Sequence, residues 1–110
     1  MKVGLIRCMK TEDKCQGKMC FKAIKEKKSV FKGAEGDIEI VGFVSCGGCP
    51  GNKAAARAAN MVKRGANTIA LTTCITKGNP AGCVCPHLQK MKEEIAKQVG
   101  EGITVFDHTH

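Results

Sequence analysis

The chain has 110 residues, enough for one domain with a buried core and too few for two independent domains. Hydrophobic residues make up 43% and charged residues 25% of the sequence, which are the proportions of a globular protein and exclude disorder as the main state. Eighteen Lys and Arg against ten Asp and Glu give a formal charge of +8, and eight Cys with three His supply an unusual density of metal-ligand side chains.

Short apolar runs alternate with longer amphipathic segments, which predicts βα units and a mostly parallel sheet. We expect four strands, at residues 2–7, 37–45, 67–73 and 103–106. Between them we expect three helices, one within residues 17–28, one at 52–64 and one at 87–99. The predicted fold class is a single three-layer α/β domain over residues 1–110, with a four-stranded sheet covered by helices on both faces. The flavodoxin-like strand order 2-1-3-4 is the simplest order that keeps every crossover right-handed.

Helix ends support this division of the chain. The second predicted helix carries a stripe of small residues that permits close packing on a sheet, and Gly65 follows where a C-terminal glycine is expected. The third begins near Pro86 and is followed by Gly100, which is the usual placement of these two residue types around a helix.

The first strand region contains neither a secretory signal nor a membrane span, because its apolar run is broken by Arg7. Eight cysteines would allow 105 disulfide pairings, and their spacing selects none of them. We therefore expect a soluble, cytoplasmic protein with mostly reduced thiols and no membrane partner.

Cysteines or histidines follow the end of every predicted strand. In chain order these residues are Cys8, then Cys46 and Cys49, then Cys74, then His108 and His110. Since the carboxyl ends of parallel strands meet at one edge, and neighbouring strands lie about 4.8 Å apart, side chains from three strands can converge within about 10 Å. This edge is the predicted functional site.

The most specific local motif is Cys46-Gly47-Gly48-Cys49, which leads through Pro50 and Gly51 into the second helix. The C-x2-C spacing lets both sulfurs point at one ion, and the glycines let the backbone turn tightly. A helix N-terminus just after a thiol lowers the thiol pKa, which favours metal binding and nucleophilic redox chemistry alike. The motif by itself does not choose between them.

A second cluster, Cys83-Val84-Cys85-Pro86-His87, precedes the third helix. Alternate residues of an extended backbone face one side, so Cys83, Cys85 and His87 can point together, as can His108 and His110. The alternative is that Cys85 only precedes the helix start and that His87 is solvated. Of the remaining thiols, Cys20 is expected to be a small core residue and Cys15 is a loop residue that could join the edge cluster.

These residues resemble the CGGC-domain family of small prokaryotic cysteine-rich proteins. The resemblance covers nearly the whole chain: an early strand-end cysteine, the central Cys-Gly-Gly-Cys, a later cysteine followed by a loop with further cysteines, and a terminal Thr-His. It implies zinc binding and no established reaction. Carried over by resemblance, the metal ligands are Cys8, Cys46, Cys49, Cys74 and His110, with Cys83, Cys85 and His108 as further candidates.

The sequence lacks the motifs that several other kinds of site require. A phosphatase-like C-x5-R loop from Cys46 would need arginine at position 52, which is Asn52, and no P-loop motif is present. Three hypotheses about the function stay open. They are zinc binding, an iron–sulfur cluster held by thiolates, and a thiol–disulfide oxidoreductase in which Cys46 attacks the substrate and Cys49 resolves the mixed disulfide. The sequence therefore does not decide whether the protein is an enzyme.

Lysines gather around the first predicted helix, at positions 22, 25, 27, 28 and 32. Basic residues are also spread over the rest of the chain, and neither stacking aromatics nor a nucleic-acid motif accompanies them. We expect a solvated surface and no nucleic-acid partner. A metal ion is the predicted partner, and the sequence does not indicate a protein partner.

Overall fold

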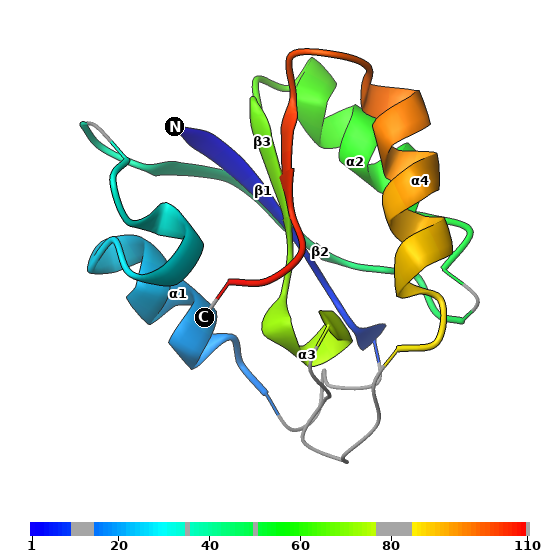
Figure 1. Ribbon diagram of the computed structural model, residues 1–110, viewed down its shortest axis with the longest axis horizontal. Helices are drawn as coiled ribbons and strands as arrows, with labels where there is room; N and C mark the ends of the chain where they lie inside the picture. The colour runs from blue at the N-terminus through cyan, green and yellow to red at the C-terminus, as the bar shows by residue number, and fades with distance from the viewer. Residues whose placement is uncertain (10–14, 35, 50, 77–84, 110) are drawn as a thin grey trace.

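The computed structural model describes residues 1–9, 15–34, 36–49, 51–76 and 85–109. Its sheet contains β1 (Lys2–Arg7), β2 (Glu39–Ser45), β3 (Thr68–Leu71) and β4 (Thr104–Phe106). The order is β2-β1-β3-β4 and every neighbouring pair is parallel, as Figure 1 lets the reader follow. The predicted α/β class and the strand order 2-1-3-4 are thus confirmed.

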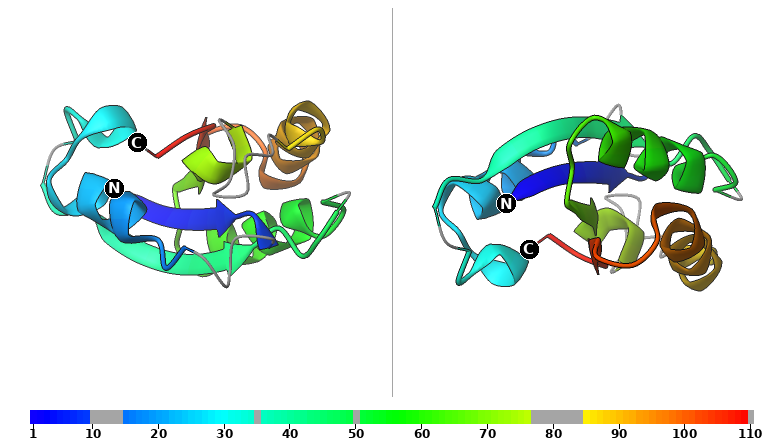
Figure 2. Two further views of the ribbon diagram at one scale, coloured as in Figure 1. Left: turned by 90° about the horizontal axis from the view of Figure 1, so that it is seen from below. Right: turned by 90° about the horizontal axis from the view of Figure 1, so that it is seen from above.

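Helices cover both faces of this sheet. One face carries α1 (Lys18–Lys25) and the short 3-10 helix η2 (Ser29–Phe31), and the other carries α2 (Ala54–Lys63) and α4 (Leu88–Val99) (Figure 1, Figure 2). All predicted elements are present with ends shifted by a few residues. Among the residues described, none of the helices combines the length and apolarity that a membrane crossing needs.

The third strand is shorter than the sequence predicts. It ends at Leu71, and Thr73–Thr76 form the helical turn α3 instead of a continuation of the strand. The run of β-branched residues favours a strand locally, but the turn places Ile75 in the core with no exposed surface, and this burial outweighs the local preference.

The core has two halves separated by the sheet. On the α2/α4 side, Ile6, Ile69, Leu71 and Ile95 are fully buried, and each stabilises the fold by about 1.5–3 kcal/mol. Met61 of α2 lies directly over two glycines of the sheet: a Cβ added at Gly4 or Gly42 would lie 2.7 Å from the Met61 sulfur. The glycines therefore set how closely α2 packs on β1 and β2.

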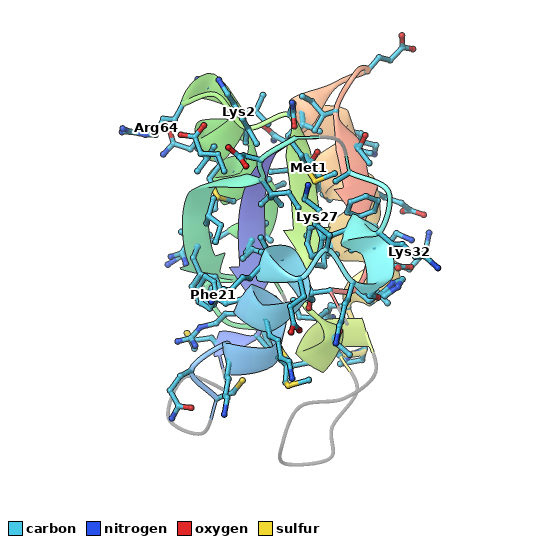
Figure 3. The ribbon with its side chains drawn as sticks, turned by 90° about the vertical axis from the view of Figure 1, so that its left-hand side faces the viewer. Met1, Lys2, Phe21, Lys27, Lys32 and Arg64 are labelled. Carbon is cyan, nitrogen blue, oxygen red and sulfur yellow. The ribbon has the colours of Figure 1, made fainter. Side chains whose placement is uncertain are left out.

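On the α1 side, Val3, Leu5, Ala23, Ile24 and Phe31 form the second half of the core. Figure 3 looks onto this layer and shows Phe21, Lys27 and Lys32 on its outer surface. Phe21 stacks on Phe43 of β2 with ring centroids 5.2 Å apart. The lysines of this layer are exposed, as expected of a solvated surface.

Candidate functional site

The carboxyl ends of the parallel strands share one edge of the sheet, and α2, α3 and α4 follow the ends of β2 and β3. The end of β1 and α3 lie at the bottom of Figure 1. Seven cysteines are among the described residues, and all seven are reduced thiols: Cys8, Cys15, Cys20, Cys46, Cys49, Cys74 and Cys85. Cys20 and Cys46 are buried, Cys49 is exposed, and the others are half-buried. The predicted ligands Cys83 and His110 lie outside the described residues, so their assignment stays a prediction.

Cys46 is fixed by the sheet. Its backbone N–H donates to the carbonyl of Arg7 at 2.7 Å, which extends the pairing of β1 and β2 by one residue beyond Ser45. Gly47 follows with φ 84°, a left-handed conformation that glycine adopts without strain. A Cβ at Gly47 would also lie 2.8 Å from the Cβ of Lys53, so the loop has no room for a side chain here.

Cys49 lies on a tight turn that the N–H of Gly51 closes by donating to the carbonyl of Gly48 at 2.8 Å. The side chain of Met9, which follows Cys8, lies over this turn: a Cβ at Gly48 would be 3.2 Å from the Met9 methyl group. The ends of β1 and β2 are therefore in contact around the Cys-Gly-Gly-Cys loop.

An arginine holds the base of this loop. The Arg57 guanidinium donates from Nη1 to the carbonyl of Ser45 at 3.0 Å and to its Oγ at 3.1 Å. The same Oγ accepts the N–H of Gly47 at 3.2 Å. Arg57 therefore fixes the residues on both sides of Cys46 and brings a permanent positive charge beside the loop. No sequence motif points to Arg57, because its role depends on the packing of α2 against the end of β2.

Cys85 joins this neighbourhood from the start of α4, where its N–H donates to the carbonyl of Ile75 at 3.1 Å. Burial raises the pKa of the Cys85 thiol, a hydrogen bond from the His87 backbone lowers it, and negative charge on Cys49, Cys8 and Cys46 raises it. Cys8, Cys46 and Cys49 thus lie close enough to act on Cys85, and we call these four the α2/α4 thiols.

Two helices begin at the α2/α4 thiols, since α2 follows Cys49 and α4 follows Cys85. Their first residues, Lys53 and His87 at the N-caps, make no capping hydrogen bond through a side chain, and neither first turn contains an acidic residue. The partial positive charge of each helix N-terminus, about half an elementary charge, is therefore not offset locally. These N-termini therefore supply positive charge at this edge of the sheet.

The other three described cysteines form a second group, which we call the α1 thiols. Cys20 Sγ lies 3.1 Å from Thr109 Oγ1, Cys74 Sγ lies 2.8 Å from Thr72 Oγ1, and Cys15 Sγ accepts the N–H of Gly17 at 3.4 Å. Burial raises the pKa of Cys20, the Thr109 hydrogen bond lowers it, and charge on Cys74 and Cys15 raises it.

Thr109 ties the end of the chain to the α1 thiols. It has no exposed surface, and its N–H donates to Thr73 Oγ1 at 3.1 Å. Cys20 is buried, as the sequence predicts for a small core residue. Cys74 packs against the α2/α4 half of the core, its Sγ lies beside Thr72 Oγ1, and its charge acts on Cys20. Cys74 thus links the α1 thiols to the half of the core that contains Cys46.

The histidine at the end of β4 has a carboxylate partner that sequence reasoning missed. His108 Nδ1 lies 2.8 Å from Asp107 Oδ1, and Lys92 Nζ lies 3.4 Å from Asp107 Oδ2. The His108 hydrogen bond is the main cause that holds the pKa of Asp107 below its usual value, with a smaller effect from Lys92. An acidic residue directly before a candidate ligand histidine is the signal that could have found this pair.

Within the described ranges, no group of three or more His, Cys, Asp or Glu side chains is arranged to hold a metal ion. The donor chemistry of the α2/α4 thiols nevertheless fits a soft or borderline cation, because four thiols gather beside two helix N-termini and Arg57. Metal binding would therefore require these side chains to turn toward a common point.

The family model of the CGGC domain matches residues 2–110. An uncharacterized protein of Methanocaldococcus jannaschii is 37% identical over 111 residues, which cover 96% of this chain and 81% of that protein. No solved structure matches the chain. The family match is consistent with a metal-binding role and specifies no metal.

Proposed function

The chain belongs to the CGGC-domain family, and from this premise we propose that it is a metal-binding protein that holds zinc through cysteine thiolates at the carboxyl edge of its sheet. The observation that carries the proposal is the group of α2/α4 thiols at the start of two helices with uncapped N-termini. Thiolate sulfur is a preferred zinc ligand, and four thiolates make a closed structural site.

Cys46 and Cys49 supply the first two thiolates in this proposal, and Cys8 and Cys85 complete the set. Cys74 and His108, ligand candidates on sequence grounds, are alternatives for the last position. Zinc bound here would tie the ends of β1 and β2 to the start of α4, so that its binding free energy adds to the stability of the fold.

Charge supports a site of this kind. Four thiolates with one dication carry a net charge of about −2, which is costly to place in a partly buried position without compensation. The Arg57 guanidinium beside Ser45 and the N-termini of α2 and α4 provide positive charge at that place. The same charges would stabilise a thiolate iron–sulfur cluster, so the metal must be identified directly.

Native mass spectrometry of protein purified without chelator tests the proposal. We expect one zinc ion per chain, colourless protein, a lower urea midpoint after chelation, and recovery of the midpoint on adding zinc. Protein without metal, whose stability does not respond to zinc, would exclude the proposal. A brown colour with visible charge-transfer absorbance in anaerobically purified protein would show that the site holds an iron–sulfur cluster instead of zinc.

One observation favours a second candidate, a thiol–disulfide oxidoreductase. Cys49 is exposed, whereas Cys46 keeps only 6% of its surface accessible. An exposed attacking thiol with a buried resolving thiol is the arrangement that such a couple needs, with Cys49 attacking and Cys46 resolving. These roles are the reverse of those expected from the sequence.

In that reaction, the Cys49 thiolate attacks a substrate disulfide and forms a mixed disulfide, and the first substrate thiol leaves with a proton. Cys46 then attacks the Cys49 sulfur, which releases the second thiol and leaves a Cys46–Cys49 disulfide, so the substrate gains the two electrons that the protein loses. A redox titration of metal-free protein, followed by mass mapping of the oxidised pair, tests this. Absence of a reversible Cys46–Cys49 disulfide would exclude the candidate.

A further inference from the structure

The strand β2 forms one edge of the sheet, with β1 as its one neighbour in the part of the chain that the structure describes. Its seven residues include the large apolar residues Ile40, Val41, Phe43 and Val44, yet none of the seven is buried. The residues of β3, by contrast, are all buried. The edge of β2 is therefore an apolar surface that the described parts of the chain leave partly open to solvent.

The apolar side chains of β2 lie on both faces of the sheet. Val41 and Val44 pack against the α2/α4 half of the core, and Phe43 packs against the α1 half. Ile40 is 38% exposed, and Phe21 of α1, which stacks on Phe43, is 37% exposed. Figure 3 shows Phe21 next to β2. Apolar residues on both faces are typical of a strand inside a parallel sheet, so the composition of β2 fits a further strand at this edge.

On the α2 face, the edge of β2 borders a groove of about 210 Å³. Val41, Val44 and Met61 line the groove with apolar side chains, and Arg57 and Arg64 of α2 add two positive charges to it. The two arginines lie two helical turns apart, which corresponds to about 10 Å along the helix axis. The groove therefore suits a short apolar side chain with a negative charge on either side.

Positive charge lies on the other face of β2 as well. The Arg7 guanidinium lies over the Phe43 ring, with Cζ 5.2 Å from the ring centroid. Glu39 is the one acidic residue of β2. A second copy of the chain paired at this edge would set Arg7, Arg57 and Arg64 of each copy against one glutamate of the other strand. Charge therefore favours an acidic partner over self-association.

The backbone of β2 is available for pairing over a short stretch. Its pairing with β1 is irregular at Val41 and regular from Gly42 to Ser45. The Cys46 N–H donates to β1, and alternate residues of a strand direct their backbone groups to the same neighbour, so Phe43 directs its N–H and C=O to the outer edge. Lysine, proline and bulges commonly protect a sheet edge from further pairing. The residues from Gly42 to Ser45 include none of these features.

From these observations we infer that the outer edge of β2 binds a short extended segment of an acidic partner protein, with an apolar centre and a carboxylate at either end. Its backbone pairs with β2 at Phe43, and its central side chain enters the groove between Arg57 and Arg64. Since every second residue of a strand faces the same side, the sequence Glu-Val-Val-Val-Glu presents glutamate, valine and glutamate to the groove. Its other two valines face Phe21 and Ile40.

Binding of such a segment needs no metal, and it also bears on the thiols. The free edge ends where Arg57 donates to the Ser45 carbonyl, one residue before Cys46. A segment paired with β2 is therefore held next to the Cys-Gly-Gly-Cys loop and brings its protein close to Cys46.

Fluorescence anisotropy with the full chain, reduced and metal-free, tests the inference. The probe is a labelled Glu-Val-Val-Val-Glu peptide flanked by serines, and it is expected to bind below about millimolar concentration. Three control peptides are expected to bind at least about tenfold more weakly. The first has lysines in place of the glutamates, the second has serines in place of the valines, and the third has N-methylated backbone amides. Equal binding of any control peptide, or no binding of the probe, would overturn the inference.

Two variants separate the groove from the overall charge of the protein. Arg64→Glu reverses one charge of the groove and is expected to weaken binding of the probe at least about tenfold. Lys63→Glu is the matched control, because it makes the same change of charge at the preceding residue of α2, which lies outside the groove. It is expected to weaken binding less than about twofold, since salt screens an exposed charge at a distance. Equal losses in the two variants would show that the net charge of the protein, and not the groove, holds the probe.

NMR and sedimentation identify the surface and its occupant. The probe is expected to shift the amide signals of Phe43 and Val44 and to leave those of β4, at the other edge of the sheet, unchanged. Shifts at β4 instead of β2 would assign the segment to the wrong edge. Sedimentation of the protein alone is expected to give a monomer. A dimer that the probe dissociates would show that a second copy occupies this edge, which would also overturn the inference.

Discussion

The α2/α4 thiols and the α1 thiols occupy the same edge of the sheet but differ in what surrounds each sulfur. Cys49 is exposed at the start of α2, and Arg57 holds the backbone that leads to it. Cys20, in contrast, is buried in α1 and shares a hydrogen bond with a threonine hydroxyl from the end of the chain. Cys49 is therefore open to solvent close to positive charge, whereas Cys20 is enclosed beside a hydroxyl.

This difference indicates that the two groups of cysteines have different roles, although the residue type is the same. The Arg57 guanidinium and two helix N-termini supply positive charge near the α2/α4 thiols, and a thiolate is the form of sulfur that binds metal and attacks disulfides. Burial favours the neutral thiol, and it raises the pKa of Cys20 in one group and of Cys85 in the other. We therefore expect chemistry at the α2/α4 thiols and a mainly structural contribution from Cys20. The following variants test this division.

The largest expected effect is on metal retention. Cys46→Ser removes a thiolate from the proposed site and is expected to weaken zinc binding at least about a hundredfold, since even loss of an outer partner of a ligand costs about 10–100-fold. Cys20→Ser leaves the α2/α4 thiols in place and is expected to retain zinc. Competition with a chromophoric chelator measures both. If Cys46→Ser and Cys20→Ser lost zinc equally, the distinction between the α2/α4 thiols and the α1 thiols would be wrong.

A smaller effect is expected from the geometry of the Cys46 to Cys49 loop. Gly47→Ala forces a left-handed conformation on alanine and also places Cβ 2.8 Å from Lys53 Cβ. We expect a loss of about 2–4 kcal/mol in the free energy of unfolding, from backbone strain and overpacking together. Urea unfolding of the metal-free variant measures the loss.

Gly33→Ala is the matched control for this prediction. Gly33 has φ 88°, close to that of Gly47, but no atom lies within 4 Å of its added Cβ. Only the strain of about 1–2 kcal/mol is expected there. If the two variants lose the same stability, the packing of Lys53 against the loop contributes nothing.

The smallest effect concerns stability at high pH. The pKa of Cys20 is raised above its ordinary value of 9.0, so the folded protein keeps this proton at pH values where the unfolded chain has released it. Its stabilising contribution is therefore complete below about pH 9 and is lost as the pH rises through the folded-state pKa.

Urea midpoints measured between about pH 8 and about pH 10 check this prediction. Cys20→Ala is expected to lower the midpoint at every pH but to make its decline across this interval shallower. Cys49→Ala, which removes an exposed thiol, is expected to decline as the unmodified protein does. A decline unchanged in Cys20→Ala would show that the buried thiol does not couple ionisation to folding.

Much of the site follows from the sequence because strands have a period of two. Cys8 comes two residues after Ile6, and both pack in the α2/α4 half of the core. The Cys-Gly-Gly-Cys spacing before a helical stripe likewise placed Cys46 and Cys49 at the start of α2. Cys74 follows the third strand as expected, but it lies in the helical turn α3, where the alternation of side chains along a strand no longer sets its direction.

The sequence by itself determined the order of βα units, the parallel sheet and the edge at which the cysteines collect, since local periodicity and chain connectivity dictate these features. Only the tertiary structure decided how the thiols divide into two groups and which side chains surround them. Cys20 meets Thr109 across 89 residues, and Arg57 meets Ser45 through the packing of α2 on β2. Such contacts depend on how the layers pack, and a local pattern does not contain that information.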